Sequence, residues 1–143
     1  GPEGQWWWHY HSDTGRIIEG YPVYSVHQYG MAPMALFELH AVGGPDFSDA
    51  VFRGLKWMRK APEINESLID RDQCAIWRKV DRTGPRKLCR VVKAVGSRIH
   101  SNLRLDWLNR LFPPRAIDFE GRPYCMGWLL YAWPGTRIDR TKT

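Results

Sequence analysis

Near its start the chain contains the stretch Gln5-Trp6-Trp7-Trp8-His9-Tyr10-His11, which decides how the first segment of the protein folds. Neighbouring side chains on an extended strand point to opposite faces, so three consecutive tryptophans cannot all lie on one side. A strand at the rim of a cavity would bury one face in the core and present the other to a flat ligand such as a sugar ring. A strand covered on both sides would place every indole in the core. Both interpretations fit the sequence.

β-Hairpins are predicted at two places along the chain. The arms Trp6–His11 and Arg16–Glu19 are rich in β-prone residues, and they flank Ser12–Gly15, a turn with glycine where a positive φ is favoured. A similar pair of short arms, Ser67–Asp70 and Ala75–Val80, predicts the second hairpin.

Helical periodicity dominates the rest of the chain. Apolar residues at near-helical spacing predict a helix over Val23–Ala41, with Pro33 as a kink or as its true start. Asp46 is a predicted N-cap of a helix that reaches Lys60. The short loop between the two helices predicts an antiparallel hairpin over Val23–Lys60. Further helices are predicted over Arg86–His100, Leu103–Leu111 and Pro123–Trp133, with an extended piece at Ile117–Glu120 and a flexible tail at 136–143.

These elements predict a mainly α fold, in which antiparallel helical hairpins carry short β-hairpins at one end, as in part of an α/α toroid. Several motifs resemble the C-terminal part of an uncharacterised bacterial group similar to six-hairpin glycosidases and to terpenoid-cyclase and prenyltransferase toroids. The motifs lie at Gly4–Tyr10, Thr14-Gly15, Glu19–Gln28, Met31–Leu36, Ile76–Arg78, Asp118–Tyr124 and Gly127–Tyr131.

The resemblance implies that residues 1–143 form one domain, a C-terminal fragment of a toroid. About five helices are predicted where a full toroid needs twelve, so we expect a companion N-terminal half, or a second copy of the chain, to cover apolar helix faces. Toroids of this kind host hydrolases, lyases, epimerases and proteins without activity, so the resemblance does not define a reaction.

Length and composition limit the class of protein. The 143 residues are enough for one domain with a real core, and no run approaches eighteen uninterrupted apolar residues. The first residues lack the build of a signal peptide. Three widely spaced cysteines fit a reducing compartment better than a disulfide framework. We therefore expect a cytoplasmic protein without a membrane span.

Carboxylates among aromatic residues are the first candidates for catalysis. Glycoside chemistry needs one protonated and one ionised carboxyl group on either side of a sugar. Glu19 with Glu120 or Asp118 is the preferred pair. The alternative is structural: Glu19 caps the following helix, and the other two acids form ion pairs with Arg122 or Arg115.

Two further residues suit a sugar site. His27 follows two tyrosines and is suited to acid/base catalysis or to hydrogen bonding, although a core histidine has the same signature. Arg78 follows an indole and is suited to clamp a carboxylate or phosphate; the alternative is a structural bridge to Asp70 or Asp118. The predicted substrate-binding residues are Trp6, Trp7, Trp8, Tyr21, Tyr24, Gln28, Trp77, Arg78, Arg122 and Tyr124.

Metal and cofactor motifs are weak in this sequence. His9 and His11 point the same way on a strand but have no third ligand spaced near them. Asp72-Gln73-Cys74 matches only part of the zinc-ligand pattern of protein prenyltransferases. A glycine-rich phosphate loop is also missing. We therefore predict no metal and no cofactor.

The net charge of +6 is unevenly distributed. Residues 1–70 hold five Lys/Arg against nine Asp/Glu, and residues 71–143 hold sixteen against six. The basic residues crowd around the predicted helix Arg86–His100, but aromatic residues are not interleaved with them, which argues against nucleic acid.

Three functions follow from these features. The first is a carbohydrate-active or glycan-binding protein linked to polysaccharide metabolism, whose reaction, if it has one, is that of a hydrolase, lyase or epimerase. The alternative is a non-catalytic interaction or scaffold domain. The third is a basic surface that binds nucleic acid or another anionic polymer.

Overall fold

The structure is a computed structural model that describes residues 1–99, 105 and 107–133. In this part of the chain, helices take up 45% of the residues and strands 15%, and the strands form three small antiparallel sheets. The expected mainly α fold is therefore wrong. Several β-prone segments at predicted helix ends and connections pair with one another and make the chain a mixed α/β protein.

The first hairpin is confirmed. Strand β1 (His9–Tyr10) pairs antiparallel with β2 (Ile17–Glu19), with His9 opposite Glu19. Gly15 in the turn has a φ of +64°, the left-handed conformation for which glycine is favoured. The three tryptophans precede β1 and lie outside the strand, so the strict alternation of faces does not apply to them.

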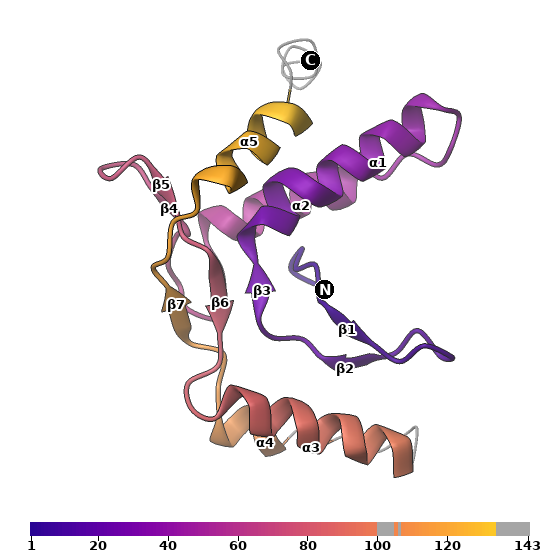
Figure 1. Cartoon of the computed structure of the whole chain (residues 1–143), viewed down its shortest axis with the longest axis vertical. Helices are drawn as coiled ribbons and strands as arrows, with labels where there is room; N and C mark the ends of the chain where they lie inside the picture. The colour runs from indigo at the N-terminus through magenta and orange to yellow at the C-terminus, as the bar shows by residue number, and fades with distance from the viewer. Residues whose placement is uncertain (100–104, 106, 134–143) are drawn as a thin grey trace.

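A three-stranded sheet forms the middle of the molecule (Figure 1). Its order is β3 (Val23–Tyr24), β6 (Lys79–Asp81) and β7 (Ala116–Asp118), and β6 is antiparallel to both neighbours. Val80 pairs with Val23 on one side and with Ile117 on the other. Val23 and Val80 are completely buried, so this sheet contributes directly to the core.

The second predicted hairpin is also confirmed, in shorter form. Strands β4 (Ile69–Asp70) and β5 (Ala75–Ile76) pair antiparallel. The backbone then leaves this hairpin at Trp77, whose N–H donates to the carbonyl of Leu68 at 2.8 Å, and enters the middle sheet as β6. The predicted arm Ala75–Val80 is therefore two strands in two sheets.

The predicted helix Val23–Ala41 consists of three parts. After β3, the π-helical segment η1 (His27–Met31) leads into α1 (Ala32–Ala41), with Pro33 in its first turn. Proline has no N–H for the carbonyl four residues earlier, which here belongs to Tyr29. The indole Nε1 of Trp133 donates to that carbonyl at 2.7 Å instead. Pro33 thus marks the start of α1, and the far end of the chain docks onto the carbonyl that it leaves free.

Two more helices pack around η1. Helix α2 (Ser48–Arg59) runs beside α1 and completes the predicted helical hairpin. Its N-cap is Phe47 and not the predicted Asp46, whose carboxylate instead accepts a hydrogen bond from Ser48 N–H at 2.8 Å just before the helix. Helix α5 (Pro123–Ala132) packs directly on η1. At this contact a side chain on Gly30 would lie 2.9 Å from Cβ of Trp128, so the close approach requires glycine.

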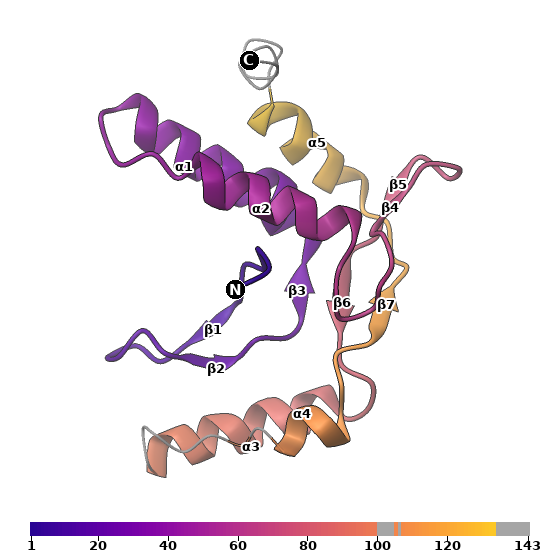
Figure 2. The same cartoon turned by 180° about the vertical axis from the view of Figure 1, so that it is seen from behind.

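The remaining helices lie at the other end of the sheet. Helix α3 (Arg86–Ile99) and the short α4 (Trp107–Leu111) are separated from α1, α2 and α5 by the middle strands, as Figures 1 and 2 show from opposite sides. The helices therefore form two groups rather than the single layer that was expected. The predicted placement of the β-hairpins at one end of such a layer is also wrong. The predicted flexible tail 136–143 lies outside the described residues, as do residue 100 of the predicted helix Arg86–His100 and residues 103, 104 and 106 of the predicted helix Leu103–Leu111.

The main core lies where the middle sheet meets α2 and η1. Its buried residues are Val23, Tyr29, Trp57, Met58, Ala61, Leu68 and Val80, with Trp7 and Trp77 among the partly buried residues packed against them.

Across the described ranges, no helix has the length and apolar character needed to cross a membrane.

Candidate functional site

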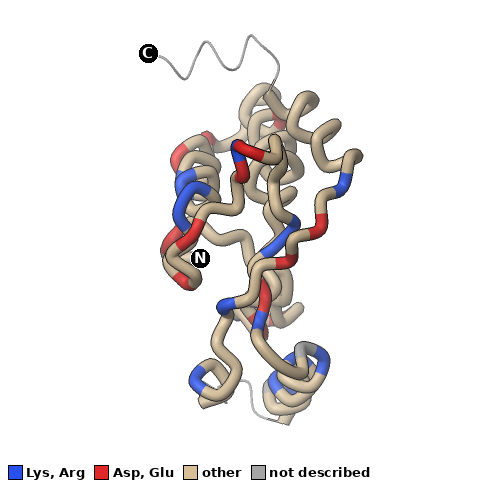
Figure 3. Tube along the Cα trace, turned by 90° about the vertical axis from the view of Figure 1, so that its left-hand side faces the viewer, with Lys and Arg blue, Asp and Glu red and all other residues tan. Residues whose placement is uncertain are grey.

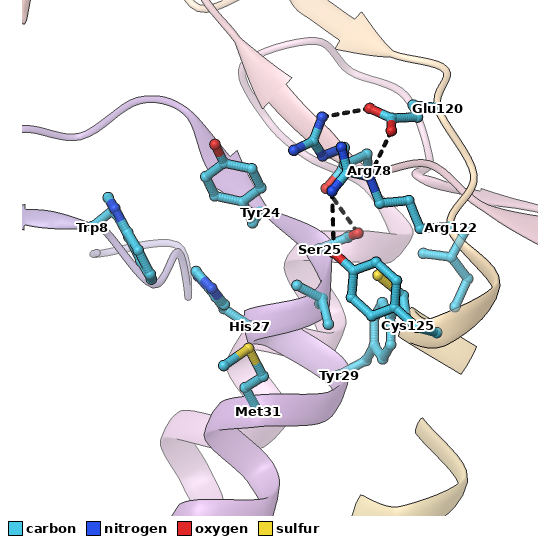
Figure 4. Close-up of a pocket in the computed structure, with 13 residues that line it drawn as sticks. Trp8, Tyr24, Ser25, His27, Tyr29, Met31, Arg78, Glu120, Arg122 and Cys125 are labelled. Carbon is cyan, nitrogen blue, oxygen red and sulfur yellow. Dashed lines mark hydrogen bonds and ion pairs between the residues drawn. The ribbon is translucent and has the colours of Figure 1, made fainter. Parts of the chain in front are cut away.

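A cavity of about 270 Å³ opens where the middle sheet meets η1 and α5. It collects side chains from segments that are far apart in the sequence (Figure 4). The segment before β1 supplies Trp8, and η1 supplies His27. The lining residues are Trp8, Tyr24, Ser25, Val26, His27, Tyr29, Met31, Ile76, Arg78, Glu120, Arg122, Tyr124 and Cys125.

The topology of the sheet explains why three of these residues meet. Strand β6 is antiparallel to β3 and β7, so its beginning lies beside the ends of both. Arg78 directly precedes β6, Tyr24 ends β3, and Glu120 follows β7. Backbone hydrogen bonds join the three segments at this end of the sheet. Ser25 N–H donates to the Arg78 carbonyl at 2.9 Å, and Arg78 N–H donates to the Asp118 carbonyl at 3.1 Å.

One wall of the cavity is aromatic. The Trp8 indole stacks on the His27 ring, with centroids 4.5 Å apart and planes inclined by 13°. Tyr24 meets the edge of the same indole at 6.1 Å. Trp8 keeps 55% of its surface exposed, so much of the indole remains open to solvent. Burial lowers the pKa of His27, and its imidazole is neutral at neutral pH.

The opposite wall is charged. The Glu120 carboxylate accepts hydrogen bonds from Arg78 Nη1 and from Arg122 Nε, the latter at 2.5 Å. Arg122 also donates to the Tyr124 hydroxyl at 3.2 Å, and the Arg78 guanidinium lies 5.6 Å from the centre of the Tyr24 ring. The hydrogen bond from Arg122, reinforced by that from Arg78, lowers the pKa of Glu120 against the opposing effect of desolvation. Two cations therefore face the cavity with one ionised carboxylate between them.

Seven of the predicted site residues line this cavity, and they come from the beginning, the middle and the end of the sequence. They are Trp8, Tyr24, His27, Arg78, Glu120, Arg122 and Tyr124. Sequence reasoning missed the small and apolar part of the lining, to which Ser25, Met31 and Cys125 belong. These residue types have no specific binding signature in a sequence, and only the packing of η1 against α5 brings them to the cavity.

Glu19 lies elsewhere, in a buried ionic cluster. Its side chain is 1% exposed and accepts hydrogen bonds from Arg82 at 2.7 and 3.2 Å, while Lys93 Nζ lies 3.2 Å from its other oxygen. Asn109 Oδ1 accepts from both cations, at 2.8 and 2.9 Å. Burial alone would raise the pKa of Glu19, but the hydrogen bonds from Arg82 and from Tyr21 N–H, with the two positive charges, lower it.

Asp118 and Trp77 are close to the cavity without lining it. The Asp118 carboxylate lies 3.4 Å from Lys79 Nζ and 3.9 Å from Arg78 Nη1, so it supports the charged wall from behind. Trp77 packs edge-on against Phe119 with ring centroids 5.2 Å apart, and its other neighbours belong to the core.

The other predicted binding residues hold the N-terminal segment in place. The Tyr21 hydroxyl donates to the Glu63 carboxylate. Gln28 is completely buried; in the orientation that satisfies its amide, it donates to the Gly4 carbonyl and accepts from Trp6 N–H, each at 3.0 Å. Trp6 is only half-buried, yet its backbone is fixed by this amide. These contacts are structural.

Metal ligation is not suggested by the geometry of the described ranges. Within 1–99, 105 and 107–133, no three His, Cys, Asp or Glu side chains gather closely enough to hold an ion.

Comparisons with protein-family models, with curated proteins and with solved structures find nothing that matches the chain. The resemblance to α/α toroids is therefore wrong on two grounds. No relative supports it, and a sheet divides the helices into two groups where a toroid would have continuous antiparallel helical hairpins.

Proposed function

We propose that the cavity between Trp8 and the Glu120 cluster binds a saccharide unit. The observation that supports this most directly is the pairing of an exposed, stacked indole with a charged wall across one small cavity. A sugar ring has apolar C–H faces that suit an aromatic surface and equatorial hydroxyl groups that suit ionic hydrogen-bond partners.

The size and charge of the cavity narrow the ligand. A volume of about 270 Å³ is near the lower end of the range for small-molecule sites, which suits one sugar ring. Among the lining residues two guanidinium groups stand beside one carboxylate, so a sugar with a carboxylate substituent gains a further ionic contact. The preferred class is thus a hexuronate, with a neutral hexose as the weaker ligand.

Binding is favoured over catalysis at this cavity. Hydrolysis of a glycoside uses two carboxyl groups, one of them protonated. Among the described lining residues Glu120 is the single acid, and its two arginine partners keep it ionised. The catalytic roles of Glu19, Asp118 and His27 stay predictions.

The test is calorimetric titration of the chain with glucuronate, galacturonate, glucose and galactose. We expect dissociation constants on the order of 0.1–1 mM, about −5.5 to −4 kcal/mol, with the uronates binding more tightly. Trp8→Ala removes the aromatic surface and should abolish binding while the thermal melt stays close to that of the parent.

Trp107→Ala is the matched control, because Trp107 is 57% exposed against 55% for Trp8 and does not line the cavity. It should bind like the parent. Equal loss in both variants, or no heat of binding with any of the four sugars, would contradict the proposal.

A further inference from the structure

Helix α3 exposes a continuous row of apolar side chains. Leu88, Val91, Val95 and Ile99 are 56%, 53%, 51% and 77% exposed. Their spacing of three, four and four residues places them along one side of the helix. We call these four residues the α3 stripe. Such a row is larger than the single exposed apolar residues that any protein surface shows.

The chain itself covers a different side of α3. Cys89 and Gly96 are buried, and α3 packs against β2. Lys93 points into the cluster around Glu19 and also reaches Asn109 of α4. At about 100° per residue, the α3 stripe lies roughly a third of a turn away from the line of Cys89 and Gly96. The stripe is therefore on the flank of the helix, between its buried line and the face directed away from β2.

The border of the stripe is strongly basic. The sequence of α3 contains no Asp or Glu. Lys87 and Arg98 are exposed and lie roughly half a turn from Cys89 and Gly96, so they occupy the face directed away from β2. Figure 3 shows the Lys and Arg positions of this helix gathered at the end of the molecule remote from α1, α2 and α5. The basic residues of α3 are Arg86, Lys87, Arg90, Lys93 and Arg98.

We propose that the α3 stripe docks an amphipathic helix of another protein, whose own apolar row is flanked by Asp and Glu. Two helices that pack side by side interlock rows of residues spaced three and four apart, which is the spacing of the stripe. The acidic flank of the partner would lie against Lys87 and Arg98. This charge complementarity sets the orientation and speeds the encounter.

The same observations disfavour the other occupants. A second copy would bring one basic α3 against another, and like charges in contact are repulsive. A helix that lies on a bilayer buries its apolar face in the lipid boundary, whereas the α3 stripe is on the flank of the helix and the outermost face bears Lys87 and Arg98. Nucleic acid would be bound by the basic residues without need of the stripe.

The test uses the whole chain and a synthetic 18-residue helical peptide that has Leu at alternating three- and four-residue spacing and Glu at the flanking positions. A matched peptide has Lys in place of Glu. Fluorescence anisotropy should give micromolar binding for the Glu peptide and at least about tenfold weaker binding for the Lys peptide. Val95→Asp should weaken the Glu peptide about tenfold or more, since it puts a charge in the contact.

Two controls decide the interpretation. Val42→Asp alters an apolar residue that is 82% exposed at the end of α1, and it should leave binding unchanged. Lys87→Glu with Arg98→Glu should reverse the preference between the peptides while circular dichroism stays that of the parent.

Several results would overturn the proposal. These are equal affinity for both peptides, equal loss in Val42→Asp, or a dimer in sedimentation that Val95→Asp dissolves. Two further results would overturn it: the chain sediments with phosphatidylserine vesicles, or it binds an oligonucleotide, and Val95→Asp weakens that binding as much as it weakens binding of the Glu peptide. None of these results bears on the sugar cavity, which lies on the other helical group.

Discussion

Glu19 and Glu120 occupy comparable surroundings, since each carboxylate accepts hydrogen bonds from an arginine and has a second cation beside it, yet they differ in exposure. The Glu19 side chain is 1% exposed and the Glu120 side chain 40%. The cations are Arg82 and Lys93 at the first, and Arg78 and Arg122 at the second.

The difference teaches what each cluster does. Glu19 ends β2, while Arg82 follows β6 and Lys93 lies on α3, so the buried cluster fastens the first hairpin and α3 to the middle sheet. Glu120 lies at the free edge of the same sheet and faces a cavity. A buried ion pair is costly to break, because the remaining charge has no water around it. A half-exposed pair exchanges protein partners for water or for a ligand at little cost.

The largest expected effect is that of Glu19→Gln. Loss of the carboxylate leaves Arg82 and Lys93 buried without a counter-ion, and we expect the free energy of unfolding to fall by about 3–5 kcal/mol. Urea denaturation followed by circular dichroism measures it. The double variant Glu19→Gln/Arg82→Met should recover part of the loss, because it removes the uncompensated charge as well. If the single variant were as stable as the parent, the buried cluster would not fasten the hairpin.

Lys93→Met should have a smaller effect at the same cluster. The Lys93 side chain is 11% exposed and contacts Glu19 and Asn109, but Arg82 still pairs with the carboxylate when Lys93 is gone. Loss of a hydrogen bond to a charged group costs about 1.5–3 kcal/mol, and we expect the unfolding free energy to fall by that amount. A loss equal to that of Glu19→Gln would mean that Lys93, rather than Arg82, is the main partner.

The sequence predicted local elements better than their arrangement. Both hairpins and the approximate start of α2 followed from turn and cap residues, whose preferences act within a few positions, although the N-cap of α2 is Phe47 and not the predicted Asp46. The two-residue strand Val23–Tyr24 has no periodicity to detect, and what makes it a strand is pairing with partners more than fifty residues away. The middle sheet, and with it the separation of the helices, therefore could not be predicted.

The candidate site was predicted in part, for the same reason. Aromatic and ionic residues such as Trp8, Arg78 and Glu120 are conspicuous in a sequence, and the structure brings these three to one cavity. Glu19 had an equally conspicuous neighbourhood but is buried in an ionic cluster. Whether an acid meets a ligand or a buried arginine depends on burial, which is a property of the tertiary packing and not of the neighbours in the chain.

Glu120→Gln should separate stability from binding. Because the carboxylate is at the surface, we expect urea denaturation of the variant to match that of the parent. The two arginines would lose the carboxylate that orients them. The affinity for the preferred uronate should therefore fall on the order of tenfold, as calorimetry can measure. A large loss of stability with unchanged affinity would reverse the roles assigned to the two clusters.

The smallest effect is expected from a change of pH on the free energy of unfolding. The cavity and the buried Glu19 cluster should respond in different pH ranges. Burial lowers the pKa of His27 from its ordinary value of 6.5, so the unfolded chain binds this proton more readily than the folded one. Stability must then fall as the pH drops below 6.5, until the folded pKa is reached.

Glu19 also has a lowered pKa, from an ordinary value of 4.5. Its contribution to the free energy of unfolding is complete above pH 4.5 and is lost as the pH falls through the folded pKa. His27→Gln should therefore remove part of the fall in unfolding free energy between pH 7 and 5, to which His9, whose pKa burial also lowers, contributes as well. The contribution of the Glu19 carboxylate itself is lost below that window. Urea denaturation at half-unit pH steps measures the slope in both pH ranges. If His27→Gln left the slope between pH 7 and 5 as steep as in the parent, the imidazole beside Trp8 would be as hydrated as in the unfolded chain, and the stacked wall of the cavity would be open to water on both sides.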